Sequence, residues 1–237
     1  MLTDKIEAIS EPTDIIVLPE MFSTGFTMNA AAFAETMDGP TLQWMQQIAI
    51  KKDCAITGSL IITEDRKFFN RLIWMMPNGH IHYDKRHLFS LAGEDKTYTA
   101  GQLQWIVSYR DWRIFPLICY DLRFPVWSRR NKKLDYDVLL YVANWPERRN
   151  FAWKQLLIAR AIENQSYVVG VNRVGNDGHN VYHSGDSVVL DYKGTTLSAL
   201  PTELEGHQTV ILKKEELKEF RNHFAFGNDG DEFTLGA

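Results

Sequence analysis

The chain has 237 residues, of which 45% are hydrophobic and 24% charged, and its formal net charge is −4. These values are typical of a globular protein, and the length favours one domain, 1–237, over two. No run approaches the roughly 18 consecutive apolar residues of a membrane span, and the basic clusters "SRRNKK" and "PERRN" are too short for a polyanion-binding surface. We therefore expect neither a membrane nor a nucleic acid as a partner.

The first ten residues, "MLTDKIEAIS", lack the basic and then apolar layout of a signal peptide. The two cysteines, Cys54 and Cys119, are too few for a disulfide framework. We therefore expect a cytoplasmic protein with both thiols free. Cys54, inside "DCAITGSL", reads as a core residue.

Helices and short apolar strands alternate in the first part of the chain. "MLTDKIEAI" places apolar residues on one helical face, and "DIIVLPE" is a strand of the kind buried on both faces. A helix within "GPTLQWMQQIAIKKDC" then leads into the strand "AITGSLII". The order strand, helix, strand indicates an α/β sheet. The buried stripe of that helix is predicted to be Leu42, Met45, Ile48 and Ala49.

Two hairpins follow, one with its turn at Pro77-Asn78-Gly79 and one around Arg110-Asp111-Trp112. After them the sequence predicts a helix near 125–133, a buried strand "DVLLYVANW", and a helix over 151–165 capped by Asn150. Further strands are predicted in "SYVVGVNRVG" and "HSGDSVVLDYKG", then a strand and a helix within 207–224, and a tail over 227–237. Buried strands separated by helices predict a layered α/β sandwich.

Charged or reactive residues stand at the ends of three of these strands. Glu20 ends "DIIVLPE", Lys85 lies at the end of the strand in "HIHYDKRHLF", and Cys119 ends "RIFPLICY". Sites in open α/β sheets gather at the carboxyl ends of strands. Taken singly, each residue has an ordinary structural interpretation: a surface carboxylate, a surface lysine and a core thiol.

Taken together, the three residue types are sufficient for acyl transfer. A thiol needs a base or a nearby cation to become a good nucleophile, because its free pKa is about 8.5. A carboxylate can act as that base, and a lysine can stabilise the oxyanion of a tetrahedral intermediate. A Cys-His arrangement is the alternative, but it would leave the Glu and Lys segments without a role.

The segments "LPEMF", "YDKRHLF" and "CYDLRFP", in this order and with this wide spacing, resemble the signature segments of the nitrilase superfamily of carbon–nitrogen hydrolases. "SGDSVVLDYKG" is similar to a later strand and turn of that family, and "CYDLRFPVWSR" is most similar to its omega-amidase subgroup. The resemblance implies an α-β-β-α sandwich, usually paired into a homodimer. It also implies an enzyme that needs neither a metal nor an organic cofactor.

The resemblance assigns roles residue by residue. It implies that Cys119 is the nucleophile, Glu20 the general base and Lys85 the oxyanion-stabilising cation. Glu94, in "LAGEDKTYTAG", corresponds to a second glutamate of the family, with an ordinary loop carboxylate as the alternative. The backbone N–H of Tyr120 is implied as a second oxyanion donor.

Omega-amidases act on small 2-oxo dicarboxylic acid monoamides, for example converting 2-oxoglutaramate to 2-oxoglutarate and ammonia through a thioester. Such a small-molecule amide carries a carboxylate, for which we expect Arg149 as the partner, with Arg148 and Arg123 as alternatives. Phe26 and Trp145 are candidates for the pocket walls. The alternative functions are another amidase or a carbamoylase of the same superfamily, or a non-catalytic binding or scaffold protein.

Two further features bear on the interpretation. None of His80, His82, His179 and His183 has the spacing of a structural zinc site, so no metal centre is expected. Members of the family usually begin with a strand that precedes the "LPE" strand. We expect either that this chain lacks the strand or that its start codon is assigned too far downstream. A sheet without that strand would leave one row of backbone groups unpaired.

Overall fold

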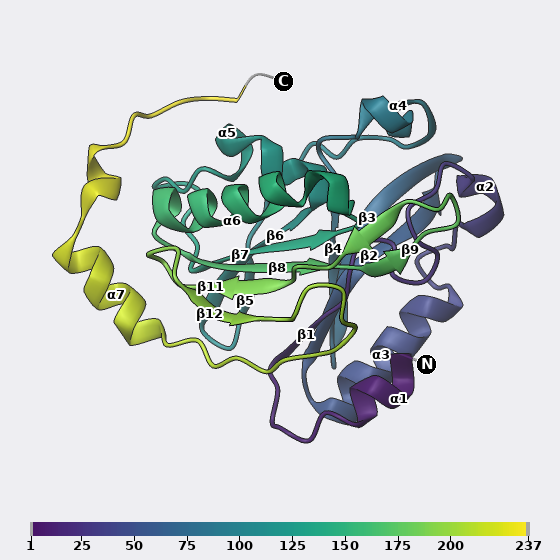
Figure 1. The fold of residues 1–237 in the computed structure, drawn as a ribbon, viewed down its shortest axis with the longest axis horizontal. Helices are drawn as coiled ribbons and strands as arrows, with labels where there is room; N and C mark the ends of the chain where they lie inside the picture. The colour runs from purple at the N-terminus through teal and green to yellow at the C-terminus, as the bar shows by residue number, and fades with distance from the viewer. Residues whose placement is uncertain (1, 236–237) are drawn as a thin grey trace.

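Two β-sheets lie face to face in the structure, a computed structural model that describes residues 2–235 (Figure 1). The first sheet contains, in spatial order, β1 (Ile15–Val17), β2 (Ala55–Glu64), β3 (Lys67–Met76) and β4 (Gly79–Asp84). The second contains, in spatial order, β12 (Thr196–Ala199), β11 (Val188–Leu190), β8 (Tyr167–Asn172), β7 (Val138–Ala143), β6 (Trp112–Ile118) and β5 (Val107–Tyr109).

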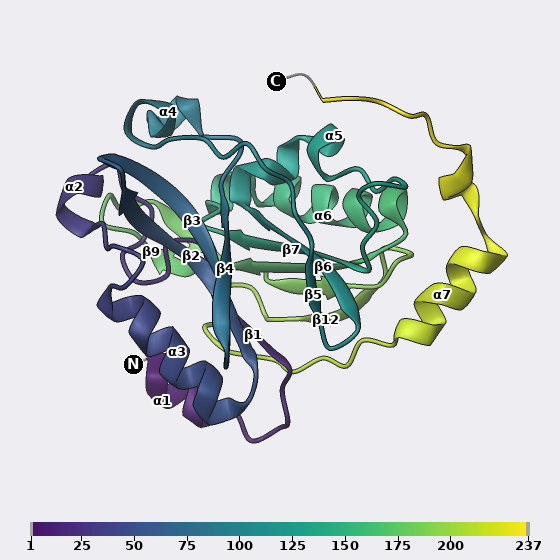
Figure 2. The same ribbon diagram turned by 180° about the vertical axis from the view of Figure 1, so that it is seen from behind.

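Helices cover the two outer faces of this pair of sheets. The first sheet is covered by α1 (Leu2–Glu7) and α3 (Pro40–Lys52), and the second by α5 (Pro125–Ser128) and α6 (Asn150–Asn164), as Figures 1 and 2 show. The layers confirm the α-β-β-α sandwich predicted from the sequence. The remaining elements are α2 (Ala30–Phe33), η1 (Ser90–Ala92), α4 (Glu94–Thr97), η2 (Cys119–Arg123), η3 (Glu147–Arg149), β9 (Val174–Asn176), β10 (Tyr182–Ser184), α7 (Lys214–His223) and η4 (Phe226–Asp229).

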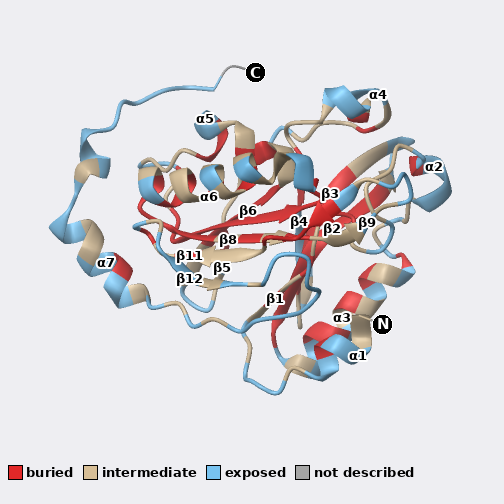
Figure 3. Cartoon of the chain, viewed as in Figure 1, coloured by how far each residue is buried: buried red, intermediate tan, exposed pale blue. Residues whose placement is uncertain are grey.

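The core follows the apolar periodicity of the sequence. The predicted stripe of α3 is buried against β2 and β3, with none of its four side chains more than 4% exposed. Large apolar residues from both sheets, among them Trp74, Leu117 and Leu140, form one buried cluster. Figure 3 shows that most of the strands in the two sheets are buried. Each such side chain stabilises the fold by about 1.5–3 kcal/mol when fully buried. Cys54 is completely buried, as predicted.

Strand direction brings the candidate residues to one end of the molecule. β1 is parallel to β2, and β4 runs in the same direction as both because two antiparallel pairings separate β2 from β4. In the second sheet β6, β7 and β8 are parallel, so their carboxyl ends share an edge. The segments that follow β1, β4, β6 and β7 meet there.

Three sequence predictions were wrong in detail. Helix α6 begins at Asn150 itself, so Arg149 occupies the N-cap position that Asn150 was expected to fill. The helix expected near 125–133 ends at Ser128, because residues 129–133 form a loop in which the Asn131 side chain accepts hydrogen bonds from two backbone N–H groups. Residues 207–213, all within the described range, form no strand, because this segment contacts β12 through the Gln208 side chain instead of a backbone ladder.

β1 lies at the edge of the first sheet. Within residues 2–235, β1 pairs only with β2, and a groove of about 1670 Å³ lies beside its other edge.

In the expected tail, η4 is followed by residues without helix or strand as far as 235, and residues 236–237 lie outside the described part. None of the helices in residues 2–235 combines the length and the apolar character that a membrane crossing requires.

Candidate active site

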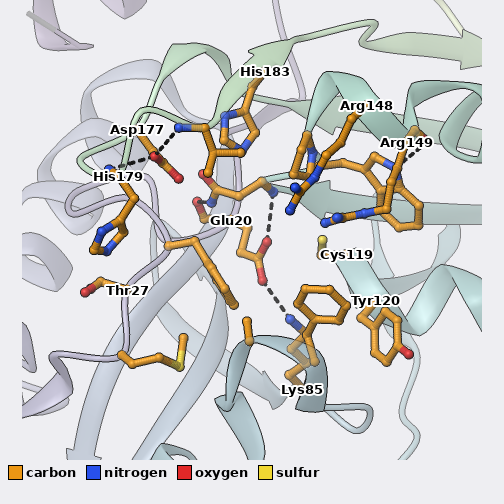
Figure 4. Close-up of a pocket in the computed structure, with 18 of the residues that line it drawn as sticks. Glu20, Thr27, Lys85, Cys119, Tyr120, Arg148, Arg149, Asp177, His179 and His183 are labelled. Carbon is orange, nitrogen blue, oxygen red and sulfur yellow. Dashed lines mark hydrogen bonds and ion pairs between the residues drawn. The ribbon is translucent and has the colours of Figure 1, made fainter.

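Glu20, Lys85 and Cys119 line one cavity of about 300 Å³ at the strand ends (Figure 4). Glu20 follows β1 by three residues, Lys85 follows β4 directly, and Cys119 follows β6 directly. The three residues are far apart in the sequence, but the parallel directions of their strands deliver them to the same place. The convergence that the sequence pattern predicted is therefore present in the fold.

Cys119 stands on a sharp turn between β6 and η2. Its φ of +42° lies in the left-handed region, which a residue with a Cβ adopts at a cost of about 1–3 kcal/mol. The apolar strand ends at Ile118, and the turn leaves Cys119 partly exposed to the cavity while Ile118 stays buried. Strain of this kind persists only where the surrounding structure holds it.

A buried carboxylate, Asp121, holds that turn to the segment that carries Lys85. Its Oδ2 accepts hydrogen bonds from the backbone N–H of Ile118 at 3.0 Å and from the Tyr83 hydroxyl at 2.9 Å. Its Oδ1 accepts from the backbone N–H of His87 at 3.0 Å and contacts His87 Nδ1 at 2.8 Å. Through these bonds Asp121 links Tyr83 and His87, which stand on either side of Lys85 in the sequence, to the turn that carries Cys119.

Lys85 bridges two carboxylates in an almost completely buried cluster. Its Nζ lies 2.9 Å from Glu20 Oε1 and 3.0 and 2.9 Å from the two Glu94 oxygens. The Lys85 side chain is 1% exposed, and those of both glutamates are 0% exposed. Glu94 also accepts a hydrogen bond from the backbone N–H of Phe89 at 2.6 Å. Glu94 therefore lies behind Lys85 and does not line the cavity.

The electrostatics of the cluster fix two of the protonation states. Burial by itself lowers the pKa of Lys85, but Glu20 and Glu94 more than compensate and raise it well above its ordinary value, so the ammonium stays charged. Burial and the negative charge of Glu20 raise the pKa of the Cys119 thiol, although Lys85 acts in the opposite direction. The resting thiol is therefore protonated, and it interacts with the Glu20 carboxylate. Burial likewise raises the pKa of Glu94, against the effect of Lys85.

Two asparagines that the sequence reasoning missed complete the surroundings of Glu20. The backbone N–H of Asn144 donates to Glu20 Oε2 at 2.8 Å, and the Asn70 amide donates to Glu20 Oε1 at 2.8 Å and to Glu94 Oε1 at 3.1 Å. Asn70 was visible as a polar interruption of an apolar strand at "FFNRL", and Asn144 as the polar residue directly after the apolar strand in "YVANW". A buried polar residue inside such a strand needs a partner, and this was the available signal.

The rest of the cavity wall combines arginines with aromatic rings. Arg123 Cζ lies 4.7 Å from the centre of the Trp145 ring, and Arg149 Cζ lies 5.1 Å from the centre of the Phe89 ring. The expected wall residues Phe26 and Trp145 line the cavity, as do Tyr120, the expected oxyanion donor, and the three candidate carboxylate partners Arg149, Arg148 and Arg123.

The arginines have no anionic partner in the described structure. Among residues 2–235, no carboxylate lies within salt-bridge distance of Arg123, Arg148 or Arg149. Burial lowers the pKa of Arg149, and the neighbouring cation Arg148 lowers it further. A bound anion would relieve that repulsion.

The opposite wall comes from the β9–β10 hairpin, which contributes Asp177, His179 and His183 (Figure 4). Neither histidine was predicted to lie in the pocket. Asp177 holds the tip of this hairpin by accepting hydrogen bonds from the backbone N–H groups of His179 and Val181. In the part of the chain that the structure describes, no group of three His, Cys, Asp or Glu side chains is arranged to hold a metal ion.

Comparison with known proteins gives similarity over nearly the whole chain. Residues 5–222 match the family described as carbon-nitrogen hydrolase. Omega-amidase YafV of Escherichia coli K12 is 46% identical over 94% of this chain and 86% of its own length. The 2-oxoglutaramate amidase of Bacillus subtilis is 34% identical over 94% of this chain and 87% of its own length.

Solved structures agree with the fold. The CN-hydrolase superfamily protein XC1258 from Xanthomonas campestris, solved with an arsenic adduct in its active site, has a TM-score of 0.95 and 42% identity, covering 99% of this chain and 91% of its own. Nit3 of Saccharomyces cerevisiae, at 21% identity over 94% of this chain and 84% of its own, shares the fold with a TM-score of 0.83. The strand-end cluster, the family match and these relatives lead to one conclusion: the chain belongs to the carbon–nitrogen hydrolase family of the nitrilase superfamily.

Proposed function

We propose that this protein is an omega-amidase, which hydrolyses the terminal amide of small 2-oxo dicarboxylic acid monoamides such as 2-oxoglutaramate. One observation carries the proposal: a cavity of about 300 Å³ places a thiol, a carboxylate and an ammonium group beside arginines that have no anionic partner among the described residues. The first three groups suit attack on an amide, and the arginines suit a substrate carboxylate. The names of the E. coli and B. subtilis relatives point to the same activity.

In the first half-reaction Cys119 attacks the amide carbon. Glu20 takes the thiol proton as the sulfur–carbon bond forms, and Lys85 and the Tyr120 N–H stabilise the resulting oxyanion. Glu20 then gives this proton to the departing nitrogen, the carbon–nitrogen bond breaks, and ammonia leaves. The product on the enzyme is a Cys119 thioester. The raised pKa of the thiol explains why a base in contact with it is needed.

The second half-reaction uses the same groups with water as the nucleophile. Glu20 takes a proton from the water, the water oxygen attacks the thioester carbon, and Lys85 again faces the oxyanion. When the carbon–sulfur bond breaks, Glu20 returns the proton to the leaving sulfur, which regenerates the thiol and releases 2-oxoglutarate. Glu94 keeps Lys85 in position from behind, with both of its oxygens within 3.0 Å of Nζ.

The substrate carboxylate is assigned to the arginine wall, with Arg149 as its main partner. The ring of Phe89 lies against the Arg149 guanidinium and orients it, while Arg148 and Arg123 add positive charge nearby. Phe26 and Trp145 would enclose the short carbon chain between the two ends of the substrate. A bidentate carboxylate contact of this type selects an anionic amide over a neutral one.

The test is ammonia release from 2-oxoglutaramate, compared with glutamine, a neutral aliphatic amide and an N-carbamoyl amino acid. We expect 2-oxoglutaramate to be preferred, and Cys119→Ala to remove turnover without changing the thermal unfolding midpoint. Preference for the carbamoyl compound or the neutral amide would indicate another amidase or a carbamoylase. Substantial activity in Cys119→Ala would contradict the mechanism. Absence of activity on the whole panel, with slow thiol labelling, would indicate a non-catalytic binding protein.

Two further parts of the proposal concern assembly and location. Phe151, Val126 and Ile162, on the outer sides of α5 and α6, are 75%, 51% and 47% exposed, and we assign this apolar surface to a homodimer contact. The free thiols of Cys54 and Cys119 suit a reducing compartment, and we assign the protein to the cytoplasm.

A further inference from the structure

Among residues 2–235, Asn70 is the one neutral side chain that donates hydrogen bonds to both carboxylates of the buried cluster. Its Nδ2 donates to Glu20 Oε1 at 2.8 Å and to Glu94 Oε1 at 3.1 Å. Its backbone carbonyl also accepts a hydrogen bond from the Lys85 N–H at 3.0 Å. A single residue in the middle of β3 therefore contacts all three charged residues of the cluster, which belong to three different segments.

The orientation of the Asn70 amide follows from its neighbours. Two carboxylate oxygens can only accept hydrogen bonds, so the NH₂ group must face them, and the opposite rotamer would place a carbonyl oxygen against two anions. The side chain is 0% exposed, and among residues 2–235 none donates a hydrogen bond to its Oδ1. A buried acceptor without a partner is unfavourable. Within residues 2–235, the Asn70 side chain therefore makes hydrogen bonds only as a donor, to Glu20 and to Glu94.

The charge balance of the cluster shows what these bonds do. Two carboxylates face one ammonium, and both Oε1 atoms lie within 3.1 Å of Asn70 Nδ2 and within 3.0 Å of Lys85 Nζ. Whenever both carboxylates are ionised, Lys85 alone leaves one negative charge in excess in a buried site. The Asn70 amide supplies a second positive dipole at the point where the carboxylates approach each other. Hydrogen bonds to the ionised form of a carboxylate favour that form.

We propose that Asn70 is a positioning residue of the amidase, which holds Glu20 beside Glu94 and keeps the Glu20 carboxylate ionised and aimed at Cys119. The titratable groups that face Glu20 are Lys85 after β4, Glu94 in α4, Cys119 after β6 and Tyr98 after α4. Of these, only Lys85 is a cation. Loss of the Asn70 donor therefore makes Glu20 easier to protonate. Because the role concerns the base of the proposed reaction, the inference rests on the proposed function.

The experiment compares the pH dependence of kcat/KM for 2-oxoglutaramate in four proteins: the wild type, Asn70→Ala, Asn70→Asp and Asn164→Ala. The acid limb of this profile reports the essential base of the free enzyme. We expect Asn70→Ala to move the acid limb upward by about one pH unit, which corresponds to a tenfold change in the ratio of ionised to protonated base. Asn70→Asp, which replaces a donor by a third carboxylate at nearly the same volume, should move it further. In both variants kcat should fall while KM changes less than about twofold.

Asn164→Ala is the matched control. Asn164 is 2% exposed and lies away from the cavity. Its Oδ1 accepts a hydrogen bond from the Arg130 N–H at 2.8 Å, and its Nδ2 donates to the Arg160 carbonyl at 2.9 Å and to Glu163 Oε1 at 3.5 Å. It should lower the unfolding midpoint and keep the wild-type pH profile. If the Asn70 variants behave like Asn164→Ala, or if neither Asn70 variant folds, the role of Asn70 is structural and the proposal is overturned.

A second measurement separates this inference from the proposed function. Alkylation of Cys119 by iodoacetamide, followed by peptide mass spectrometry between about pH 4 and 8, needs no substrate and reports thiol activation by Glu20. We expect its acid limb to move upward in Asn70→Ala as the kinetic one does. A wild type that hydrolyses no amide would refute the function, while a shifted alkylation profile would still support Asn70. An unshifted profile would overturn the role of Asn70 even in an active amidase.

Discussion

Replacing Lys85 by methionine tests the buried charge cluster directly. The substitution keeps an unbranched side chain that is one atom shorter, and it leaves Glu20 and Glu94, both 0% exposed, without their cation. Removing one partner from a buried ion pair destabilises a protein by about 3–5 kcal/mol, because it leaves an uncompensated charge. Here the two remaining carboxylates also lie next to each other, since both contact the same Nζ in the native cluster.

The expected loss depends on pH, and its sign follows from proton linkage. Burial raises the pKa of Glu94 even in the presence of Lys85, and removal of the cation raises it further. The folded variant therefore binds a proton at pH values where an unfolded glutamate, with a pKa of about 4.3, has lost it. Stability then falls as pH rises, by about 1.4 kcal/mol per unit. Between about pH 4.3 and 7 the loss amounts to about 3–4 kcal/mol, which agrees with the range for a broken buried pair.

The assay is urea unfolding of the wild type, Lys85→Met and Lys154→Met at about pH 5 and 7. Lys154 pairs with Asp186 at 2.7 Å but is 44% exposed, so its replacement should cost about 1 kcal/mol at both pH values. Lys85→Met should be clearly less stable at the higher pH. An equal loss at the two pH values, of the size seen for Lys154→Met, would refute the description of the cluster as two buried carboxylates held by one ammonium.

Other predictions concern substrate binding and assembly. Arg149→Ala should raise KM for 2-oxoglutaramate by about 10–100-fold, because it removes a hydrogen bond to a charged group. KM for a neutral amide such as propionamide should stay the same. An equal rise in KM for both substrates would contradict the assignment of the carboxylate to Arg149. Phe151→Asp places a charge on the apolar side of α6 and should convert a homodimer to a monomer, as measured by light scattering. The unfolding midpoint of the subunit should not change. A monomeric wild type would contradict the dimer proposal.

The fold was predictable because its strands are strongly apolar and its helices carry clear stripes. The stripe of α3 is buried as its spacing indicated, and both hairpins form at the expected turns. Two of the errors lie at helix boundaries, for example where Arg149 precedes α6 and Asn150 was expected to, and the third is the strand expected within 207–213, which does not form. Such boundaries depend on tertiary contacts that a local pattern does not contain.

The site was predictable to the extent that its residues stand at strand ends. Glu20, Lys85 and Cys119 share this feature, and the structure places all three in one cavity. Asn70 and Asn144 could not be assigned in the same way. Their contacts with Glu20 join residues 50 and 124 positions apart, and only the pairing of the strands and the packing of the two sheets bring them together. The histidines of the β9–β10 hairpin reach the cavity for the same reason.

The measurement that bears most directly on the central claim is mass spectrometry of the protein after rapid acid quench during turnover of 2-oxoglutaramate. The mechanism predicts a 2-oxoglutaryl group attached to the peptide that contains Cys119, formed before steady state and absent from Cys119→Ala. Ammonia release without any acylated Cys119, or acylation of a different residue, would contradict it.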